Sequence, residues 1–299
     1  MNTTTPIVIA LAAAILCWMG TVRGQKAKPS RNDPFQESDE VQQSYQLVPG
    51  AIVDVSNISG SVAIETSDTS MAEVRVVRTA RSRAELAYHN VIVEQQASGL
   101  VVRGESDRER TVPRGVRVRH RVLVKIPRQV SLSVNTISGA ATIGNIDGPV
   151  QVKNISGSAQ LAAVSGPLIV SGVSGPLTVG NVGDKVQLTN ISGNVTVGGT
   201  VGHLELRNVS GNVTATIERL DGRGVLVRTV SGVIELRFAD ELNADVVASD
   251  IDGDILLDVP DVSLQSTPVR TMFRARVGTG GRPISITNVS GKVRLVKAG

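Results

Sequence analysis

The chain has few aromatic residues and almost no cysteine. Its 299 residues include three Phe, two Tyr, one Trp and one Cys. A core with so few rings must be aliphatic, and Val, Ile, Leu and Ala suit thin stacked layers better than a broad sandwich. The single Cys17 excludes a disulfide within the chain. His89, His120 and His203 lack metal-ligand spacing and suggest no catalytic triad.

Helical periodicity and nucleotide-binding motifs are also missing. Beyond residue 50 no 3.6-residue repeat of apolar positions is visible, which predicts little helix. The glycines lie between strand-like runs rather than before a helix, so neither a phosphate loop nor a dinucleotide fingerprint is present. Because stacking platforms for bases are scarce, we expect no nucleic-acid partner. The sequence suggests no small-molecule substrate and no cofactor.

A nine-residue repeat is the dominant feature of the sequence. From Gly139 to Gly211 every ninth residue is glycine, except Asp184. Short exact periods indicate solenoids. The second, fourth and seventh residues after each of the first eight repeat positions are apolar, and only Thr200 departs from this rule. The second and fourth share one face of a strand, so the chain must bend before the seventh points inward again.

The bend falls on a recurring corner of the form Asn-Ile-Ser-Gly. Glycine tolerates positive φ, and Asn or Ser side chains bond to nearby backbone, which is the chemistry that a repeated corner needs. We predict structural roles for the corner residues, with asparagines bonding along the solenoid axis. These residues are Asn154, Gly157, Asn190, Gly193, Asn208 and Gly211.

Alternate corners differ, which predicts that two of the nine-residue units form one coil. Beyond Gly211 the corner returns at Gly232 and again at Gly253, at a longer but constant interval, so the coils are expected to widen without losing register. The predicted fold is all-β. It is a single-stranded, right-handed parallel β-helix, a β-solenoid of about 18–21 residues per coil, with an irregular N-terminal β portion.

The N-terminal region divides into segments of different composition. Residues 1–24 contain an uncharged apolar run and a small residue before Gln25, which is typical of a cleaved signal peptide. An uncleaved anchor is the alternative, although the run is short for a membrane span. Residues 25–44 are interpreted as a flexible polar leader, with order beginning near Tyr45. Residues 45–134 are the irregular first portion and 135–299 the regular repeats. We expect export to the periplasm, the cell surface or the medium.

Basic residues concentrate toward both ends of the predicted solenoid, and acidic residues dominate its middle. Residues 116–122 alternate like a strand with arginines on its outer face. A solvated face that protects an exposed strand is the simpler interpretation. Contact with an anionic surface, lipid head groups or cell-wall polymer, is the functional one. The candidate binding residues are Arg75, Arg78, Arg117, Arg119, Arg121, Lys125, Arg270, Arg274 and Arg276.

An aspartate cluster is the best candidate for chemistry, formed by Asp250, Asp252, Asp254 and Asp258. A polysaccharide-active enzyme would need two carboxylates flanking the scissile bond, and usually aromatic rings against the sugar, which this chain lacks. The spacing also departs from an EF-hand loop and from the calcium-binding nonapeptide. We therefore interpret Asp252-Gly253 as a corner and predict no catalytic, cofactor-binding or metal-binding residue.

The order of motifs resembles the bacterial putative-adhesin domain family, a domain of unknown function made of β-strand repeats. The matching stretches are residues 53–62, 124–127, 136–139 and 278–291. The resemblance implies a β-helix at the cell envelope and transfers no catalytic residue. It favours a non-enzymatic, adhesin-like envelope protein. The alternative is an envelope-stress accessory that docks on a membrane partner, another envelope protein, and the lesser alternative is a polysaccharide-active enzyme.

Overall fold

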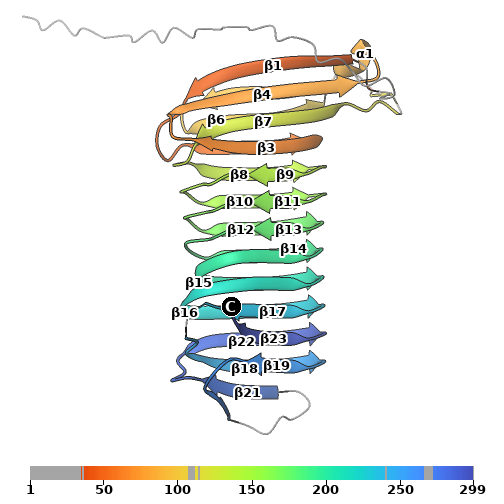
Figure 1. The fold of residues 1–299 in the computed structure, drawn as a ribbon. Helices are drawn as coiled ribbons and strands as arrows, with labels where there is room; N and C mark the ends of the chain where they lie inside the picture. Colours follow the sequence, from red (N-terminus) through yellow and green to blue (C-terminus); the bar gives the residue numbers. More distant parts are fainter. Residues whose placement is uncertain are drawn as a thin grey trace, which may run out of the picture.

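The computed structural model describes residues 35, 37–106, 112–113, 115–239, 241–265 and 272–298. These residues form a single elongated stack of β-strands that run across its long axis, with a short helix at one end (Figure 1). The predicted signal peptide, the first part of the leader and Arg270 lie outside the described residues. Among the described residues, no helix combines the length and apolar character needed to cross a membrane.

The middle of the stack consists of regular coils with two faces. Neighbouring strands are parallel and offset by two repeat units, as Val150 opposite Leu168 and Ala159 opposite Leu177 illustrate. One face has β8 (Ser131–Ile137), β10 (Val150–Ile155), β12 (Leu168–Ser174) and β14 (Val186–Ser192). The other has β9 (Ala141–Ile143), β11 (Ala159–Leu161) and β13 (Leu177–Val179). β15 (Val195–Ser210) and β16 (Val213–Ser231) run through both faces, and β17 (Ile234–Phe238) follows.

The apolar positions of the repeat form one continuous aliphatic core along these coils. Val152 and Ile155, for example, are 0% exposed. Their alternation with polar outer residues fixes the register, because a one-residue slip would turn the whole apolar set outward. The all-β expectation and the coil of two repeat units are therefore confirmed.

The coil widens within β15 and β16. Val195 lies opposite Val213, which is the regular offset of two repeat units, whereas Leu204 lies opposite Val225, which is a longer offset. Bulges between these pairs accommodate the difference. The added residues make a turn in which Asp221 Oδ1 accepts hydrogen bonds from the N–H groups of Arg223, at 2.8 Å, and Gly224, at 3.2 Å. The widening expected from the sequence is thus located at this turn.

The C-terminal coils do not stack in chain order. β22 (Arg282–Ser290) and β23 (Val293–Lys297) pair with β16 and β17, and β18 (Ala244–Asp252) and β19 (Ile255–Asp258) lie beyond them. The N–H of Gly232 donates to Ser290 O at 2.9 Å, and the N–H of Gly291 donates to Asp252 O at 2.8 Å. When the chain forms β18 and β19, it leaves the layer next to β16 and β17 empty, and β22 and β23 later occupy that layer. Equal spacing of corners along the sequence cannot distinguish adjacent layers from alternate ones.

The stack ends differently at its two ends. At the C-terminal end β21 (Met272–Val277) is antiparallel to β18, and β20 (Val262–Leu264) is antiparallel to β21. At the other end β2 (Ile52–Ile58) and β3 (Gly60–Ser67) stack on β8 and β9. Beyond β2 lie β6 (Gly99–Ser106) and β5 (His89–Gln96). Beyond β3 lie β7 (Arg119–Pro127), β4 (Met71–Ala80) and β1 (Glu37–Gln46).

We call residues 37–127, with the short helix α1 (Arg83–Leu86), the N-terminal cap. Several of its pairs are antiparallel, so the sheet as a whole is mixed. The expectation of a flexible leader through residue 44 is wrong for residues 37–44, which belong to β1. β1 is an edge strand with mostly exposed side chains, so its sequence lacks the alternation that indicates a strand. Backbone pairing with β4 holds this strand in place instead.

Candidate functional site

The candidate basic residues do not form one surface. Six of them belong to the N-terminal cap, whereas Arg274 and Arg276 lie on β21 at the opposite end of the stack (Figure 1). Arg117 lies two residues before the start of β7. The two ends are separated by all the regular coils.

Arg75 and Arg78 have carboxylate partners within the cap. Arg75 Nε donates to Glu40 Oε1 at 2.7 Å, and this hydrogen bond raises the pKa of the Arg75 guanidinium. Arg78 pairs with Asp39 on β1 and donates to Leu86 O, at 3.2 Å, and His89 O, at 3.0 Å. Its side chain is only 16% exposed. The contacts of Arg78 are those of a residue that ties β1, α1 and β5 together.

Two further candidates also lie beside carboxylates. Lys125 faces Glu73 across the β4–β7 pair and Glu65 across the β3–β7 pair. Arg276 Nε donates to Asp245 Oδ1 at 3.0 Å. The pKa of Asp245 is lowered, first by the hydrogen bond from the N–H of Gly281 and then by Arg276. These pairs reduce the net positive charge that Lys125 and Arg276 present to a partner.

The remaining cap arginines differ from these, and we call Arg117, Arg119 and Arg121 the arginine stripe. All three are exposed and alternate with buried Val118, His120 and Val122. Within the described part of the chain no ion pair to a carboxylate involves them, and the Arg119 guanidinium lies 3.8 Å from the centroid of the Phe35 ring. The stripe is therefore a row of positive charge, with Arg119 and Arg121 on β7 and Arg117 just before it.

Sequence reasoning missed two neighbours of the stripe, Arg81 and Arg83. Both are exposed; Arg81 directly follows β4, and Arg83 is the first residue of α1. The β4–β7 register places Thr79 opposite Arg119, which brings the end of β4 to the start of β7. The signal available in the sequence was the basic run from Arg78 to Arg83.

His120 lies on the buried side of the same strand. Its Nδ1 is 3.0 Å from Ser59 O, and its Nε2 has no hydrogen-bond partner among the described residues. Burial lowers the pKa of His120, because removal from water disfavours the charged imidazolium. Arg78 lies directly opposite on β4, so a second positive charge here is unfavourable.

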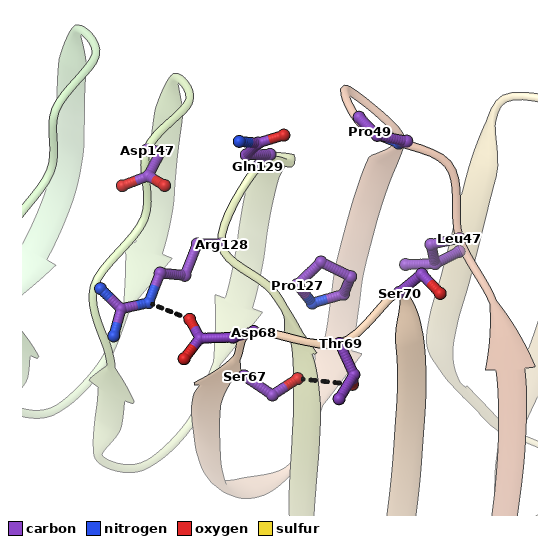
Figure 2. A pocket seen from close by; sticks show the side chains of 10 residues that line it. All are labelled: Leu47, Pro49, Ser67, Asp68, Thr69, Ser70, Pro127, Arg128, Gln129 and Asp147. Carbon is purple, nitrogen blue, oxygen red and sulfur yellow. Dashed lines mark hydrogen bonds and ion pairs between the residues drawn. The ribbon is translucent and has the colours of Figure 1, made fainter.

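A hollow of about 390 Å³ opens at the other end of β3 and β7, between the β3–β4 and β7–β8 turns (Figure 2). The side chains of Asp68 and Arg128 point toward one another, with Arg128 Nε 3.2 Å from Asp68 Oδ1. Ser67 Oγ and Thr69 Oγ1 lie 3.2 Å apart. These polar groups satisfy each other rather than converging on the hollow. Nowhere in the described ranges do three or more His, Cys, Asp or Glu side chains group as a metal site.

The aspartate cluster occupies corner positions. Asp250 has φ of 54°, as do Asn57 and Asn154 in their own coils. Asp252 accepts the N–H of Gly291 at its carbonyl, and Asp254 lies 3.5 Å from Lys292 Nζ. The geometry matches the interpretation of this segment as one more corner.

The predicted corner residues lie where the backbone is most constrained. Asn154 and Asn190 have φ of 54° and 55°, in the left-handed region that asparagine tolerates better than most residues. A Cβ on Gly157 would lie 2.3 Å from Gly139 O, and one on Gly193 2.4 Å from Gly175 O. A Cβ on Gly211 would likewise lie 2.4 Å from Gly193 O. The Asn208 side chain lies outside the described part.

Asparagines between the predicted corners bond along the solenoid axis. Asn145 Oδ1 accepts the N–H of Ala163 at 3.0 Å, and Asn181 Oδ1 accepts that of Gly199 at 2.9 Å. Asn194 accepts the N–H of Asn212 at 3.1 Å, which in turn accepts that of Val233 at 3.0 Å. Asn154 Nδ2 donates to Asn135 Oδ1 at 3.2 Å. Asn154 is a predicted corner residue, whereas the sequence repeats the other positions less strictly.

Several solved structures are similar to this chain. A putative adhesin from Bacteroides fragilis NCTC 9343 is 10% identical with a TM-score of 0.44, and the match covers 86% of this chain and 97% of that one. A putative adhesin from Parabacteroides distasonis ATCC 8503 is 12% identical with a TM-score of 0.32, covering 87% and 97%. Likeness at this level supports no conclusion about function. No curated protein matches the chain.

A family model described as Toastrack DUF4097 matches residues 51–296. The match runs from the start of β2 almost to the end of β23, so it includes every regular coil and all of the described strands except β1. It agrees with the resemblance to putative-adhesin domains seen in the sequence. The chain belongs to the Toastrack DUF4097 family.

Proposed function

We propose that the chain is an exported, non-enzymatic, adhesin-like surface protein. In this proposal the regular coils wind as a right-handed, single-stranded parallel β-helix and act as a rigid spacer. The arginine stripe contacts an anionic surface of the cell envelope, either lipid head groups or cell-wall polymer. The observation that carries the proposal is the exposure of Arg117, Arg119 and Arg121 without a carboxylate partner among the described residues.

The energetics of such a contact are favourable. A basic side chain close to an anionic membrane contributes about 1 kcal/mol, so a stripe of arginines supplies a few kcal/mol without a shaped pocket. Arg81 and Arg83 lie at the same end of the cap and add to the positive field. Because β7 is held by β3 on one side and β4 on the other, the arginines need little additional ordering on contact.

The non-enzymatic part of the proposal rests on where the carboxylates lie. Glycoside hydrolysis needs two carboxyl groups facing each other across a substrate. Asp250 and Asp252 instead occupy a corner, and Asp68 is paired with Arg128 in the hollow of Figure 2. Neither place offers a pair of free carboxylates across a cleft.

The proposal is tested by co-sedimentation of the full-length chain, expressed with its own leader, with phosphatidylglycerol vesicles and separately with purified cell wall. The test variant is Arg117→Glu, Arg119→Glu and Arg121→Glu combined. The matched control combines Arg103→Glu, Arg219→Glu and Arg228→Glu, which are exposed arginines that change net charge equally. We expect the stripe variant to lose binding at least about tenfold while the control retains most of it. Equal losses would mean that net charge alone acts, and would reject the stripe as the site.

An accessory that docks on a membrane partner is the second candidate function. It is favoured by one observation, the uncovered C-terminal end of the stack, where β19 pairs only with β23 among the described strands. A search for partners by crosslinking in intact cells separates the two candidates, since an accessory gives one protein adduct from that end.

A further inference from the structure

At the C-terminal end, the two faces of the stack carry different numbers of strands beyond the last coil. On one face β18 is extended by β21 and then by β20. On the other face the described strands stop at β19, which pairs with β23 alone. At the N-terminal cap, by contrast, both faces are extended beyond the solenoid, by β6 and β5 on one side and by β7, β4 and β1 on the other. The C-terminal end therefore lacks a described strand beside β19.

The backbone of β19 presents hydrogen-bonding groups at this free edge. The N–H of Val293 donates to Asp254 O at 2.9 Å, so the peptide groups of Asp254 and Leu256 face β23. Along a strand these groups alternate between the two neighbours, which directs the N–H and C=O of Ile255 and Leu257 away from β23. An extended segment laid beside β19 would find both donors and acceptors there.

The side chains around the free edge are apolar and incompletely covered. Ile255 and Leu257 lie opposite Val293 and Leu295, which are 0% exposed, yet they are themselves only half-buried. Leu256, on the outer face of β19, is 46% exposed. Across the end of the core, Leu264 on β20 is 63% exposed and Phe273 on β21 is half-buried. A strand added beside β19 would cover this open end of the core.

Three aspartates flank the edge, and Lys292 pairs with one of them. Asp252, Asp254 and Asp258 border β19 on both sides, and Asp254 is 80% exposed with only Lys292, at 3.5 Å, as a partner among the described residues. The complement of this edge is a β-prone segment with apolar residues at alternate positions and Lys or Arg at its ends. We propose that β19 accepts such a segment from a partner protein by strand addition, with backbone hydrogen bonds supplying affinity and the aspartates selecting basic flanks.

A second copy of this chain is a poor occupant of the same edge. Pairing β19 with β19 of another copy would bring two sets of aspartates into one interface, and like charges facing each other are destabilising. The edge lies at the end of the stack opposite the arginine stripe, so this proposal rests on the accessory candidate and can fail without the adhesin-like function failing.

The test is a fluorescence anisotropy titration of the full-length chain, expressed with its own leader, with two labelled peptides. Both have a Val-Thr-Val-Thr-Val-Thr centre, one flanked by Lys-Lys at each end and the other by Glu-Glu. We expect the Lys-flanked peptide to bind at least about fivefold more tightly. Asp258→Lys should reduce that preference to parity or reverse it, while Glu94→Lys, an exposed and equal charge change on β5, should leave it unchanged.

A second variant addresses the backbone edge. Leu257→Pro removes an N–H that faces away from β23 and should abolish binding of both peptides. Circular dichroism checks that it folds, and if it does not, the Asp258→Lys comparison decides alone. Equal affinity for both peptides, or binding that persists in folded Leu257→Pro, would overturn the proposal. So would a dimer in sedimentation that Leu257→Pro dissociates, because the occupant would then be a second copy.

Discussion

Gly291 packs directly against Gly232, although the two residues lie on coils far apart in the sequence. A Cβ on Gly291 would come within 2.1 Å of Gly232 O. This contact fixes the last coil of the chain inside the stack, between the coils of Gly232 and Gly253, rather than at its end.

Gly291→Ala should therefore destabilise the protein. Alanine must displace backbone atoms of the neighbouring coil and adopt a φ of 139°, so we expect a loss of about 2–4 kcal/mol in the free energy of unfolding. Urea denaturation measures it. Gly222→Ala is the control, since nothing lies within 4 Å of its Cβ. Similar stabilities of the two variants would contradict the non-sequential stacking.

Asn190→Ala should lower stability by about 1 kcal/mol, because alanine pays the cost of the left-handed conformation at φ of 55°. Asn190→Gly should retain more stability than Asn190→Ala, since Gly172 holds the corresponding place in the preceding coil with φ of 68°. Thermal midpoints of the two variants and the wild type provide the comparison. If alanine is tolerated as well as glycine, backbone strain does not explain the corner asparagine.

Thr200→Val should stabilise the protein. Thr200 is 1% exposed, its hydroxyl has no hydrogen-bond partner among the described residues, and it bridges to Val182 in a column otherwise made of apolar residues. Replacing an unsatisfied buried hydroxyl with a methyl group should gain about 1 kcal/mol. The reverse change, Val182→Thr, should cost a similar amount in the same urea experiment. A destabilised Thr200→Val would mean that the hydroxyl is satisfied in solution.

His120 should make the N-terminal cap sensitive to acid. Its pKa in the folded chain lies below the ordinary value of 6.5, chiefly through burial. The unfolded state then binds more protons, so the stability that neutral His120 contributes is complete above the unfolded pKa and is lost as the pH falls toward the folded one. The change in unfolding free energy between pH 7.5 and pH 5 should be smaller in His120→Gln, because glutamine does not titrate. Identical pH profiles would show that His120 does not cause the loss of stability between pH 7.5 and pH 5.

Arg78→Ala should loosen the N-terminal cap without affecting the regular coils. Removing the guanidinium leaves Asp39 and the carbonyls of Leu86 and His89 without its hydrogen bonds. Hydrogen exchange in β1, α1 and β5 should accelerate, while that in β10 to β14 stays unchanged. Arg75→Ala serves as the control, because its pair with Glu40 is solvent-exposed and such pairs contribute little. Equal hydrogen-exchange rates in the two variants would show that Arg78 does not hold β1, α1 and β5 together.

The repeat made the coil predictable, whereas the caps were not. Val150, Val152 and Ile155 repeat a pattern that permits only one register, and the corner glycines mark where each turn occurs. β1 lacks such a pattern because it is held in place by backbone pairing with β4 rather than by burial of its side chains. The sequence could not predict that β22 enters between β16 and β18, since several corners are chemically equivalent.

The candidate surface was predictable only in part. The alternation around Val118 and Val122 placed the arginine stripe on an outer face, and that face is exposed. The internal partners of Arg78, by contrast, come from β1, α1 and β5, which no local pattern brings together. Charge counts along a sequence cannot reveal which arginines are already paired across strands.

The most direct test of the central claim is the affinity of the full-length chain for phosphatidylglycerol vesicles across a salt series. Contact through Arg117, Arg119 and Arg121 predicts binding that weakens steeply as ionic strength rises, because exposed charges are screened within about 10 Å at 0.1 M salt. Binding of undiminished strength at high salt, or no binding at low salt to either the vesicles or purified cell wall, would contradict the account and leave the stripe as a solvated face of the N-terminal cap.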